Sequence, residues 1–395
     1  MKILIVHNRY RIRAGEDNVF DQEAALLKEH GNEVKTWTVD NQNIPEKKSS
    51  WQQIKLAFNT IWSISAYRSI SKIIKEFKPD IVHVHNILPL LSPSIFYACK
   101  KQKVPVIQTI HNYRLGCPAA TYFRDEKICE LCVDKSLLNS IRYRCYRNSY
   151  AQTTIVAAML QIHRWLGTWE NIVSGYIALT PFMKDKLIQL GIPEEKIFVK
   201  PNFINNSITK TKPISFGKYY LFVGRLSPEK GIHVLLEAYK QCNTSYPLVI
   251  IGKGELQNIV EDAAKNDSRI QYLGQQPREK VLQYMQEAIA LIFPSVWQEP
   301  FGLSIIEAYS QSLPVIGADV GSVNQLIQPH LTGLLYSLKD ALQLGNIFEK
   351  IEGNCKEWLG LKNKLKDHLN DKYFSQTNVE IMLSIYQQII QKFIK

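Results

Sequence analysis

The sequence predicts an α/β protein with two domains, each built around a parallel sheet. With 395 residues the chain is too long for one ordinary hydrophobic core and fits two domains of roughly 200 residues each. Short apolar runs alternate with segments of helical periodicity, which is typical of parallel sheets with crossover helices. Hydrophobic residues make up 45% of the composition and charged residues 21%, which supports two full cores and argues against extended disorder.

The first series of elements begins with a buried strand over residues 3–6. Further strands are expected over 34–39, 81–85, 104–110, 175–179 and 197–200, and helical segments over 19–30, 54–77 and 181–190. Gly31 and Gly191 directly follow two of these segments, where a glycine commonly ends a helix. This alternation predicts the first sheet.

A polar stretch separates the two series. Residues 204–217 are rich in Asn, Thr, Lys, Ser and Pro and lack periodicity, so we place the interdomain linker there. Strands of a second series are expected over 219–223, 248–251, 270–272, 291–293 and 315–316. We therefore expect an N-terminal domain over residues 1–203, with a cysteine-bearing insertion at about 113–150, a C-terminal domain over 204–372, and a final helix over 373–395.

The net charge of +12 is concentrated in the first half of the chain. Residues 1–200 contain 28 Lys and Arg against 18 Asp and Glu, whereas residues 201–395 contain 20 against 18. A basic first half indicates an anionic partner there, such as a membrane surface or a lipid-linked phosphate, unless the whole proteome is basic. No nucleic-acid-binding motif accompanies the charge, so nucleic acid is not expected as a partner.

No apolar run approaches the ~20 residues that a membrane-spanning helix requires. The apolar run over residues 3–6 is followed at once by His7, Asn8 and Arg9, which favours a buried strand over a signal peptide. The sequence therefore predicts a cytoplasmic protein, with peripheral docking on the inner face of the plasma membrane as a further expectation.

That expectation comes from residues 51–78, which combine bulky apolar and basic side chains. The apolar ones are Trp51, Ile54, Phe58, Ile61, Trp62, Ile64 and Tyr67, and the basic ones are Lys55, Arg68, Lys72, Lys75 and Lys78. Such a segment can lie in a membrane interface, or it can pack on the sheet as a helix with a solvated basic edge. A second basic group, Arg142, Arg144 and Arg147, follows later in the chain.

Two carboxylates eight positions apart, Glu299 and Glu307, mark the most informative segment. The apolar run over 289–295 predicts a buried strand before them, and the turn Pro300-Phe301-Gly302-Leu303 opens a helix. The helix carries Glu307 roughly 8 Å from Gly302, at about 1.5 Å per residue. This separation suits a long polar ligand with an anion at the helix N-terminus, although two solvated glutamates are the simpler alternative.

The segment resembles the E-x7-E signature of retaining, nucleotide-sugar-dependent glycosyltransferases of family 4, which have the GT-B architecture. Residues 221–231 resemble the family pattern G-R-L-x-x-x-K-G, which implies that Gly224, Arg225 and Lys230 bind the donor pyrophosphate. Gly252 opens a turn similar to the family's G-x-G-x-L turn beneath the nucleotide, and residues 271–274 resemble the segment that recognises the base. Residues 317–322 resemble the family's glycine-rich loop, but Gln325 stands near the usual position of a glutamate.

Two segments of the first half resemble the family more weakly. His111 ends a strand at the position where the family has a histidine facing the donor sugar, and Asn112 follows in place of a frequent aspartate. Gly15 lies in a loop similar to the family's glycine loop near the donor phosphate, where Ala14 replaces the first of two glycines.

The resemblance implies two Rossmann-like domains facing across a cleft, with a C-terminal helix that returns to the N-terminal domain. A helical apolar stripe of Leu383, Tyr386, Ile389, Ile390 and Phe393 fits that return, or packing on the helix's own domain. The implied donor is a UDP-hexose, with UDP-glucose or UDP-galactose preferred, and the acceptor a growing, lipid-linked cell-surface polysaccharide.

The resemblance also implies roles in transfer with retention. Glu307 would bind the ribose together with contacts from Phe301, Gly302 and Leu303, and Glu299 would hold the sugar 3- and 4-hydroxyls. We expect a front-side, oxocarbenium-like route that needs no metal, because no D-x-D motif is present. A GT-B sugar-nucleotide epimerase and a non-catalytic sugar-nucleotide-binding protein are the alternatives.

Four of the seven cysteines, Cys117, Cys129, Cys132 and Cys145, fall in the insertion with spacings C-x11-C-x2-C-x12-C. A four-thiolate structural zinc site, thiols without metal and disulfides all remain open, although a reducing cytosol disfavours disulfides.

Overall fold

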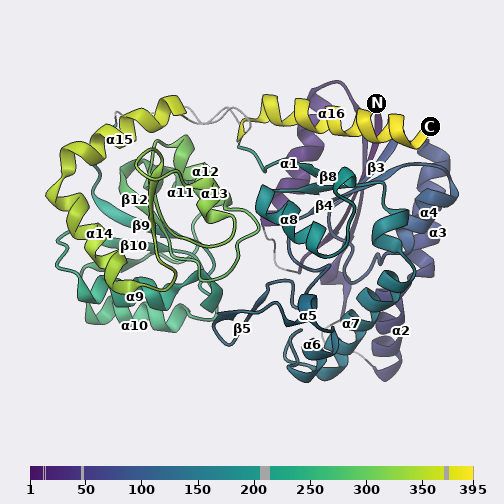
Figure 1. Cartoon of the computed structure of the whole chain (residues 1–395), viewed down its shortest axis with the longest axis horizontal. Helices are drawn as coiled ribbons and strands as arrows, with labels where there is room; N and C mark the ends of the chain where they lie inside the picture. The colour runs from purple at the N-terminus through teal and green to yellow at the C-terminus, as the bar shows by residue number, and fades with distance from the viewer. Residues whose placement is uncertain (12, 14, 46–48, 205–213, 369–372, 395) are drawn as a thin grey trace. The chain divides into compact units, whose positions relative to one another are not determined.

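The computed structural model describes the chain except for residues 12, 14, 46–48, 205–213, 369–372 and 395. The described residues form two compact units. Unit 1 contains Met1–Tyr122, Glu130–Asn202 and Gln376–Lys395, and unit 2 contains Phe123–Cys129 and Phe203–Ser375. Each unit has a six-stranded sheet whose strand pairs are all parallel (Figure 1), which confirms the predicted α/β class with two parallel sheets. Most of the predicted linker falls on residues 205–213 and so lies outside the described residues.

The sheet of unit 1 has the strand order β2-β1-β3-β4-β7-β8. Its strands are β1 (Lys2–Arg9), β2 (Glu33–Asp40), β3 (Ile81–Val84), β4 (Val106–Ile110), β7 (Gly175–Ala178) and β8 (Ile197–Val199). The larger helices are α1 (Gly15–Glu29), α2 (Ser50–Ile61), α3 (Ile64–Phe77), α4 (Ser94–Lys101), α7 (Tyr150–Trp165) and α8 (Pro181–Gln189). The central strands are continuous apolar runs because both faces of a parallel sheet are covered.

The helical segment expected over residues 54–77 consists of two helices. Ser63 interrupts it, because its side chain accepts a hydrogen bond from the Ala66 N–H and caps the start of α3. A capping box of Ser49 and Gln52 begins α2. Helix α3 buries Ala66 and other small or aliphatic side chains against unit 1, so the sheet-packing interpretation is correct for α3.

The insertion contains more regular structure than its polar sequence indicates. It forms a hairpin of β5 (Phe123–Arg124) and β6 (Lys127–Ile128), then α5 (Leu131–Asp134) and α6 (Leu138–Arg142). The hairpin turn places Asp125 and Glu126 at positive φ angles of 50° and 55°. Positive φ at both central positions is the geometry of a tight hairpin turn. The sequence did not predict this turn, because it lacks the Asn-Gly or Asp-Gly pair that is typical of one.

The sheet of unit 2 has the strand order β11-β10-β9-β12-β13-β14. Its strands are β9 (Tyr219–Val223), β10 (Leu248–Ile251), β11 (Ile270–Tyr272), β12 (Ala288–Phe293), β13 (Val315–Ala318) and β14 (Gly333–Tyr336). The helices are α9 (Ile232–Gln241), α10 (Gln257–Asn266), α11 (Arg278–Glu287), α12 (Leu303–Ser310), α13 (Val323–Leu326), α14 (Ala341–Gly353) and α15 (Cys355–His368). Strand β14 was not expected, because its four residues carry no alternation or flanking pattern that distinguishes them from a loop.

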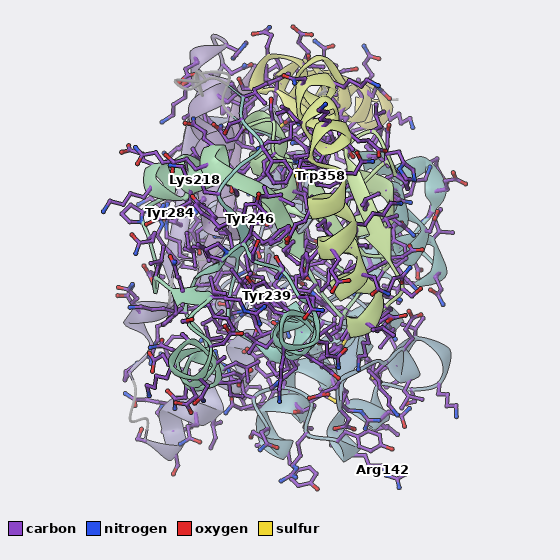
Figure 2. All side chains as sticks on the ribbon, turned by 90° about the vertical axis from the view of Figure 1, so that its left-hand side faces the viewer. Arg142, Lys218, Tyr239, Tyr246, Tyr284 and Trp358 are labelled. Atoms are coloured by element: carbon purple, nitrogen blue, oxygen red, sulfur yellow. The ribbon has the colours of Figure 1, made fainter. Side chains whose placement is uncertain are left out.

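The core of unit 2 joins the sheet to helices on its face. Tyr220 of β9 packs on Phe348 of α14 with ring centroids 4.5 Å apart. Trp358 of α15, labelled in Figure 2, donates its indole N–H to the carbonyl of Ile289 at 2.9 Å. Lys362 of the same helix is buried and donates to the carbonyl of Ala288 at 2.8 Å, and burial lowers its pKa to about 8. These bonds tie α15 to the start of β12.

The C-terminal helix α16 (Ser375–Ile394) belongs to unit 1 from Gln376 onward. This confirms that the helix returns to the N-terminal sheet. The predicted stripe was partly wrong, because Phe393 is 39% exposed and the buried face begins further back, at Asn378 and Val379. Tyr386 is fully buried and reaches the side chain of His83 in β3. Within the described ranges, no helix has the length and apolar character needed to cross a bilayer.

Gly231→Ala should destabilise the protein. Gly231 lies at φ +72°, and an added Cβ would overlap the carbonyl oxygen of Pro294. We expect a loss of about 2 kcal/mol or more in the free energy of unfolding, from backbone strain and this overlap. Gly360→Ala is the matched control, because its Cβ would meet open space within α15. Urea denaturation should show the control unchanged or more stable by up to about 1 kcal/mol, and equal effects would contradict the strain.

Candidate active site

The loop after β9 presents two basic side chains. Gly224 follows the strand, and its N–H bonds the carbonyl of Ile251 at 3.1 Å. Arg225 is largely exposed and lies 3.0 Å from the carboxylate of Glu229. Lys230 ends a short 3-10 turn over Pro228–Lys230 and is much less exposed. The two cations predicted to bind phosphate therefore come from one strand-to-helix connection.

Lys230 forms an ion pair with Glu299. Its ammonium lies 2.5 Å from Glu299 Oε1, which also accepts a hydrogen bond from the Ser295 hydroxyl at 2.7 Å. The Glu299 residue is 3% exposed, so its charge is compensated locally rather than by water. The structure therefore brings together two residues that the sequence placed in separate motifs. Ser295, at the end of the apolar run, was not predicted as part of the site.

The loop that carries Glu299 is held by the glycine-rich loop after β13. The Ser322 N–H bonds the Glu299 carbonyl at 3.3 Å, and its hydroxyl bonds the Pro300 carbonyl at 3.1 Å. Gly321 lies at φ +57°, and a Cβ there would come within 2.8 Å of Gln298 Cα. Residues 317–322, which resemble the family's glycine-rich loop, therefore support the loop that carries Glu299.

The glycines after β9, β10 and β11 meet at one edge of the sheet. The Gly252 N–H bonds the Gly274 carbonyl at 2.9 Å, and the Tyr272 hydroxyl bonds the Gly252 carbonyl at 2.9 Å. Gly252 has φ +148°, and a Cβ there would overlap the carbonyl of Gly224. This close approach of backbones explains the glycine at position 252 without reference to a ligand.

Glu307 lies inside α12, whose first residue is Leu303 and whose N-cap is Gly302. Burial raises the pKa of Glu307, and the guanidinium of Arg278 opposes this shift from 3.0 Å. Arg278 begins α11 and was not predicted, because nothing in the sequence connects the two helices. Phe301 is buried, with its ring 6.4 Å from that of Tyr373.

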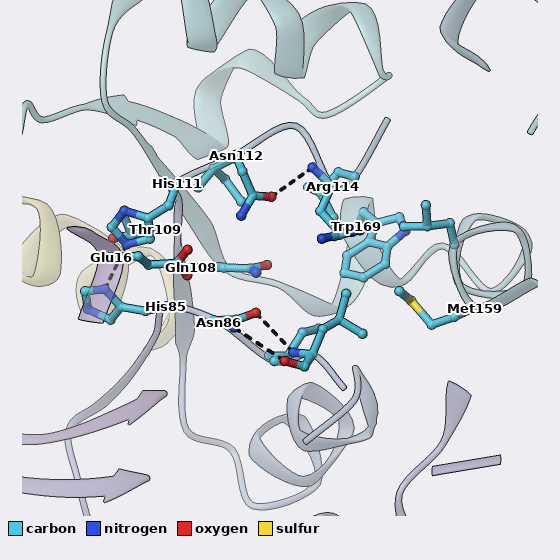
Figure 3. Close-up of a pocket in the computed structure, with 15 residues that line it drawn as sticks. Glu16, His85, Asn86, Gln108, Thr109, His111, Asn112, Arg114, Met159 and Trp169 are labelled. Carbon is cyan, nitrogen blue, oxygen red and sulfur yellow. Dashed lines mark hydrogen bonds between the residues drawn. The ribbon is translucent and has the colours of Figure 1, made fainter. Parts of the chain in front are cut away.

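Figure 3 shows a pocket in unit 1 that is lined by His111 and Glu16. His111 follows β4, and Glu16 lies in the first turn of α1, directly after Gly15. Burial raises the pKa of Glu16, whose carboxylate accepts a hydrogen bond from the Tyr10 hydroxyl at 2.9 Å. Asn112 accepts a hydrogen bond from the Arg114 N–H at 3.0 Å, so its side chain shapes the turn after β4. Ala14 lies outside the described residues.

Behind His111 lies a buried histidine cluster. His85 Nδ1 lies 2.9 Å from His111 Nε2, and the rings of His83 and His85 are 4.5 Å apart. Burial lowers the pKa of His83 to about 4 and holds the pKa values of His85 and His111 well below the usual value. All three rings are therefore neutral at pH 7. The sequence showed His83 and His85 at the end of β3, but gave no reason to connect them with His111.

Two family models match the chain. Residues 17–207 match "Glycosyltransferase Family 4", and residues 205–364 match "Glycosyl transferases group 1". A Klebsiella pneumoniae protein described as "Uncharacterized 41.2 kDa protein in cps region" is 30% identical over 333 residues, which cover 82% of this chain and 83% of the relative. The chain belongs to glycosyltransferase family 4, of the polysaccharide-biosynthesis type.

Solved structures agree with this assignment at the level of the fold. The Anabaena protein Alr3699/HepE, solved in complex with UDP-glucose, has a TM-score of 0.67 and 17% identity, with 99% of both chains covered. The lipopolysaccharide outer core galactosyltransferase WaaB has a TM-score of 0.62 and 18% identity, with 97% of this chain and 99% of that chain covered. The fold of this glycosyltransferase is therefore GT-B.

The glycosyltransferase also gathers Glu23, His83 and His85 within the spacing of metal ligands. The donor set does not fit a cation, however. The Lys200 ammonium already lies 2.7 Å from Glu23 Oε1, and the Tyr386 hydroxyl lies 2.6 Å from His83 Nδ1. A metal would have to displace both groups and lie beside a buried positive charge.

The four cysteines of the insertion do not form a zinc-like cluster in the described part of the glycosyltransferase, where the only grouping of three or more potential ligands is that of Glu23, His83 and His85. All seven cysteines are thiols rather than disulfides. Cys129 falls in unit 2, whereas Cys117, Cys132 and Cys145 fall in unit 1. The described residues thus contain thiols and give no support for a zinc site, which stays a prediction.

Acidification should destabilise this glycosyltransferase through its neutral histidines. The pKa of His83 is about 4 in the fold against 6.5 ordinarily, so between these values the unfolded chain binds a proton that the fold does not. Stability should fall as pH falls through that window, by up to about 1.4 kcal/mol per pH unit for each such histidine. Urea denaturation at several pH values should show a shallower slope for His83→Gln. His233→Gln, which removes an exposed histidine of α9, should leave the slope unchanged.

Proposed function

We propose that this glycosyltransferase moves a hexose from a UDP-sugar, with UDP-glucose or UDP-galactose preferred, to a growing, lipid-linked cell-surface polysaccharide, with retention of the anomeric configuration. The observation that carries the proposal is the Lys230–Glu299 ion pair beside Arg225, at the edge where the glycine turns meet. It joins a phosphate-binding cation to a carboxylate that can hold sugar hydroxyls. The sequence resemblance and the nucleotide-bound structural neighbour support the same donor class.

Each residue has a proposed role. Arg225 and Lys230 stabilise the departing diphosphate, whose negative charge grows in the transition state. Glu299 holds the sugar hydroxyls, and His111 contacts the sugar from its own pocket. Glu307 binds the ribose, and the remaining donor contacts come from Gly15, Gly224, Gly252, Phe301, Gly302 and Leu303. In this scheme the positive charge needed at the leaving group comes from side chains, so a divalent metal is dispensable.

Retention through a front-side route is supported by the partners of the two carboxylates. A covalent route requires a nucleophilic carboxylate and a second carboxyl about 5 Å away across the scissile bond. Glu299 is engaged by Lys230 and Ser295, and Glu307 by Arg278. Both carboxylates therefore act better as hydrogen-bond acceptors than as nucleophile or base. The same engagement makes Glu299 a poor proton-abstracting base, which disfavours the epimerase alternative.

A donor panel tests the proposed reaction. The enzyme is incubated with UDP- and GDP-sugars, with and without lipid extract, and sugar transfer or hydrolysis is measured. We expect turnover with a neutral UDP-hexose, and persistence of that turnover in EDTA. Loss of activity in EDTA that Mg²⁺ or Mn²⁺ restores would refute the metal-independent mechanism. Turnover with GDP-sugars alone would refute the donor assignment.

Glu307→Ala should weaken UDP binding. Loss of a charged hydrogen bond to the ribose should cost about 1.5–3 kcal/mol, which is roughly a 10- to 150-fold rise in Kd. Glu279→Ala is the matched control, because Glu279 is an exposed glutamate of the neighbouring helix α11. Calorimetry with UDP measures both variants. An unchanged Kd for Glu307→Ala would show that the ribose assignment is wrong.

We propose that α2 and the nearby arginines dock the enzyme on an anionic membrane. The apolar side chains of Trp51 and Phe58 on α2 are 73% and 69% exposed, which leaves them unburied by unit 1. Arg147 lines the same groove as Leu56 and Ala57 of α2. Arg142 (Figure 2) lies over the ring of Tyr143, which is itself 41% exposed. Apolar side chains beside arginines suit insertion at the head-group level.

Liposome flotation tests the docking surface. Binding should rise with the fraction of anionic lipid and fall as salt is raised, because each basic residue near the surface contributes about 1 kcal/mol that salt screens. The double variant Trp51→Ser with Phe58→Ser should reduce flotation severalfold. Leu342→Ser, which removes an exposed leucine of α14 in unit 2, should not. Equal binding to neutral vesicles would contradict electrostatic docking.

A further inference from the structure

A continuous chain of buried polar groups leads from Lys200 to His111 inside unit 1. The Lys200 ammonium lies 2.7 Å from Glu23 Oε1. Glu23 Oε2 lies 3.4 Å from His85 Nε2, and His85 Nδ1 lies 2.9 Å from His111 Nε2. Lys200, Glu23 and His85 are at most 3% exposed. Glu23 Oε2 and His85 Nε2 form no hydrogen bond within the described residues, and their 3.4 Å contact is an electrostatic one; His83 Nδ1 lies further from the same oxygen, at 3.9 Å.

The negative charge of Glu23 orients the two imidazoles that follow it. A carboxylate repels the lone pair of a ring nitrogen 3.4 Å away and attracts its N–H, so His85 turns Nε2–H toward Glu23. A neutral imidazole has one N–H, so His85 Nδ1 carries the lone pair and accepts from His111. His111 must then carry its proton on Nε2. Its other ring nitrogen, Nδ1, is left as a hydrogen-bond acceptor.

The groups packed around the chain do not offer a competing arrangement. His83 uses Nδ1 for the Tyr386 hydroxyl at 2.6 Å and Nε2 for the Thr109 hydroxyl at 2.7 Å. His7 meets the ring of His85 edge-on and points its Nε2 to Asp17 instead. Lys200 gives a second hydrogen bond, at 2.9 Å, to Asn378 of α16. The C-terminal helix thus holds Lys200, which is the first member of the series Lys200–Glu23–His85–His111.

We propose that Glu23 and His85 are positioning residues that hold His111 as the Nε2–H tautomer, so that Nδ1 accepts a hydrogen bond from a hydroxyl of the donor sugar. This rests on the proposed contact between His111 and that sugar. A lone pair repels a carboxylate, so the donor class is a neutral hexose with a hydroxyl at this position rather than a hexuronic acid. The tautomer is thereby a determinant of donor specificity.

Nitrogen NMR of the full-length protein labelled with ¹⁵N-histidine tests the tautomer without any substrate. The signals of His85 and His111, assigned by His85→Asn and His111→Asn, should both show the proton on Nε2. A proton on Nδ1 of His111 in the wild-type protein would overturn the proposal. If a variant fails to fold, the two signals are assigned in the wild-type protein from the through-space contact between the adjacent rings of His85 and His111.

Glu23→Gln should reverse the direction of the hydrogen bond between His85 and His111. With Lys200 holding the amide oxygen, the glutamine NH₂ would face His85 Nε2, which would then have to accept. His85 would donate from Nδ1, and His111 would carry its proton on Nδ1. Tyr386→Phe is the matched control, because it removes a buried hydrogen bond to the neighbouring His83 and leaves the chain intact. An unchanged His111 tautomer in folded Glu23→Gln would contradict the proposal.

The affinities of two UDP-sugars test whether the His111 tautomer affects donor specificity. The wild-type enzyme should bind UDP-glucose more tightly than UDP-glucuronate by about tenfold or more, the ratio expected from one charge-sensitive hydrogen bond. Glu23→Gln should shrink or reverse that ratio, whereas Tyr386→Phe should preserve it, as measured by calorimetry. An unchanged ratio in Glu23→Gln refutes the specificity role. If neither sugar nor UDP binds the wild-type protein, the proposed function fails instead, and the NMR result still stands.

Discussion

Both sheets of this chain are parallel and covered on both faces, and this burial determines where polar chemistry can occur. The strands contribute apolar side chains such as those of Leu221 and Ile292, which are at most 1% exposed. The candidate site residues that follow strands then lie in the connections at one edge of each parallel sheet. Gly224 follows β9 and Glu299 follows β12 in unit 2, whereas His111 follows β4 in unit 1. The proposed site residues of the glycosyltransferase thus lie at the strand ends, where the covered faces of the sheets leave room for them.

Within unit 2, each charged residue assigned to the donor already has a partner of opposite charge. Arg225 pairs with Glu229, Lys230 with Glu299, and Arg278 with Glu307. The Lys230–Glu299 pair is the most buried of these, so removing either member would leave a charge poorly solvated. A diphosphate that binds Arg225 and Lys230 must share or replace these partners. The net binding free energy of the diphosphate therefore depends on how well its contacts with Arg225 and Lys230 compensate for the weakened ion pairs with Glu229 and Glu299.

In unit 1, a fully buried ion pair is stabilised by additional hydrogen bonds. Lys200 and Glu23 are both fully buried, and the pair is tolerable because Asn378 and the carbonyl of Pro201 take the remaining Lys200 hydrogen bonds. Asn378 belongs to α16, so the C-terminal helix contributes polar contacts as well as the apolar face around Ile389. This explains why the last helix of the chain belongs to the first unit, where its polar and apolar residues both find partners.

The sequence by itself determined the α/β class and most strands, because continuous apolar runs such as Tyr219–Val223 have few other stable environments. It also singled out Arg225, Lys230, Glu299 and Glu307 through local motifs. Tertiary structure alone decided that Lys230 meets Glu299, that Arg278 meets Glu307, and that Lys200, Glu23 and His85 form a chain behind His111. These partners lie 26 to 177 positions apart, and nothing in local periodicity encodes which of these groups meet. Their pairing is set by the cost of burying an unpaired charge, which exists only once the sheets and helices have packed.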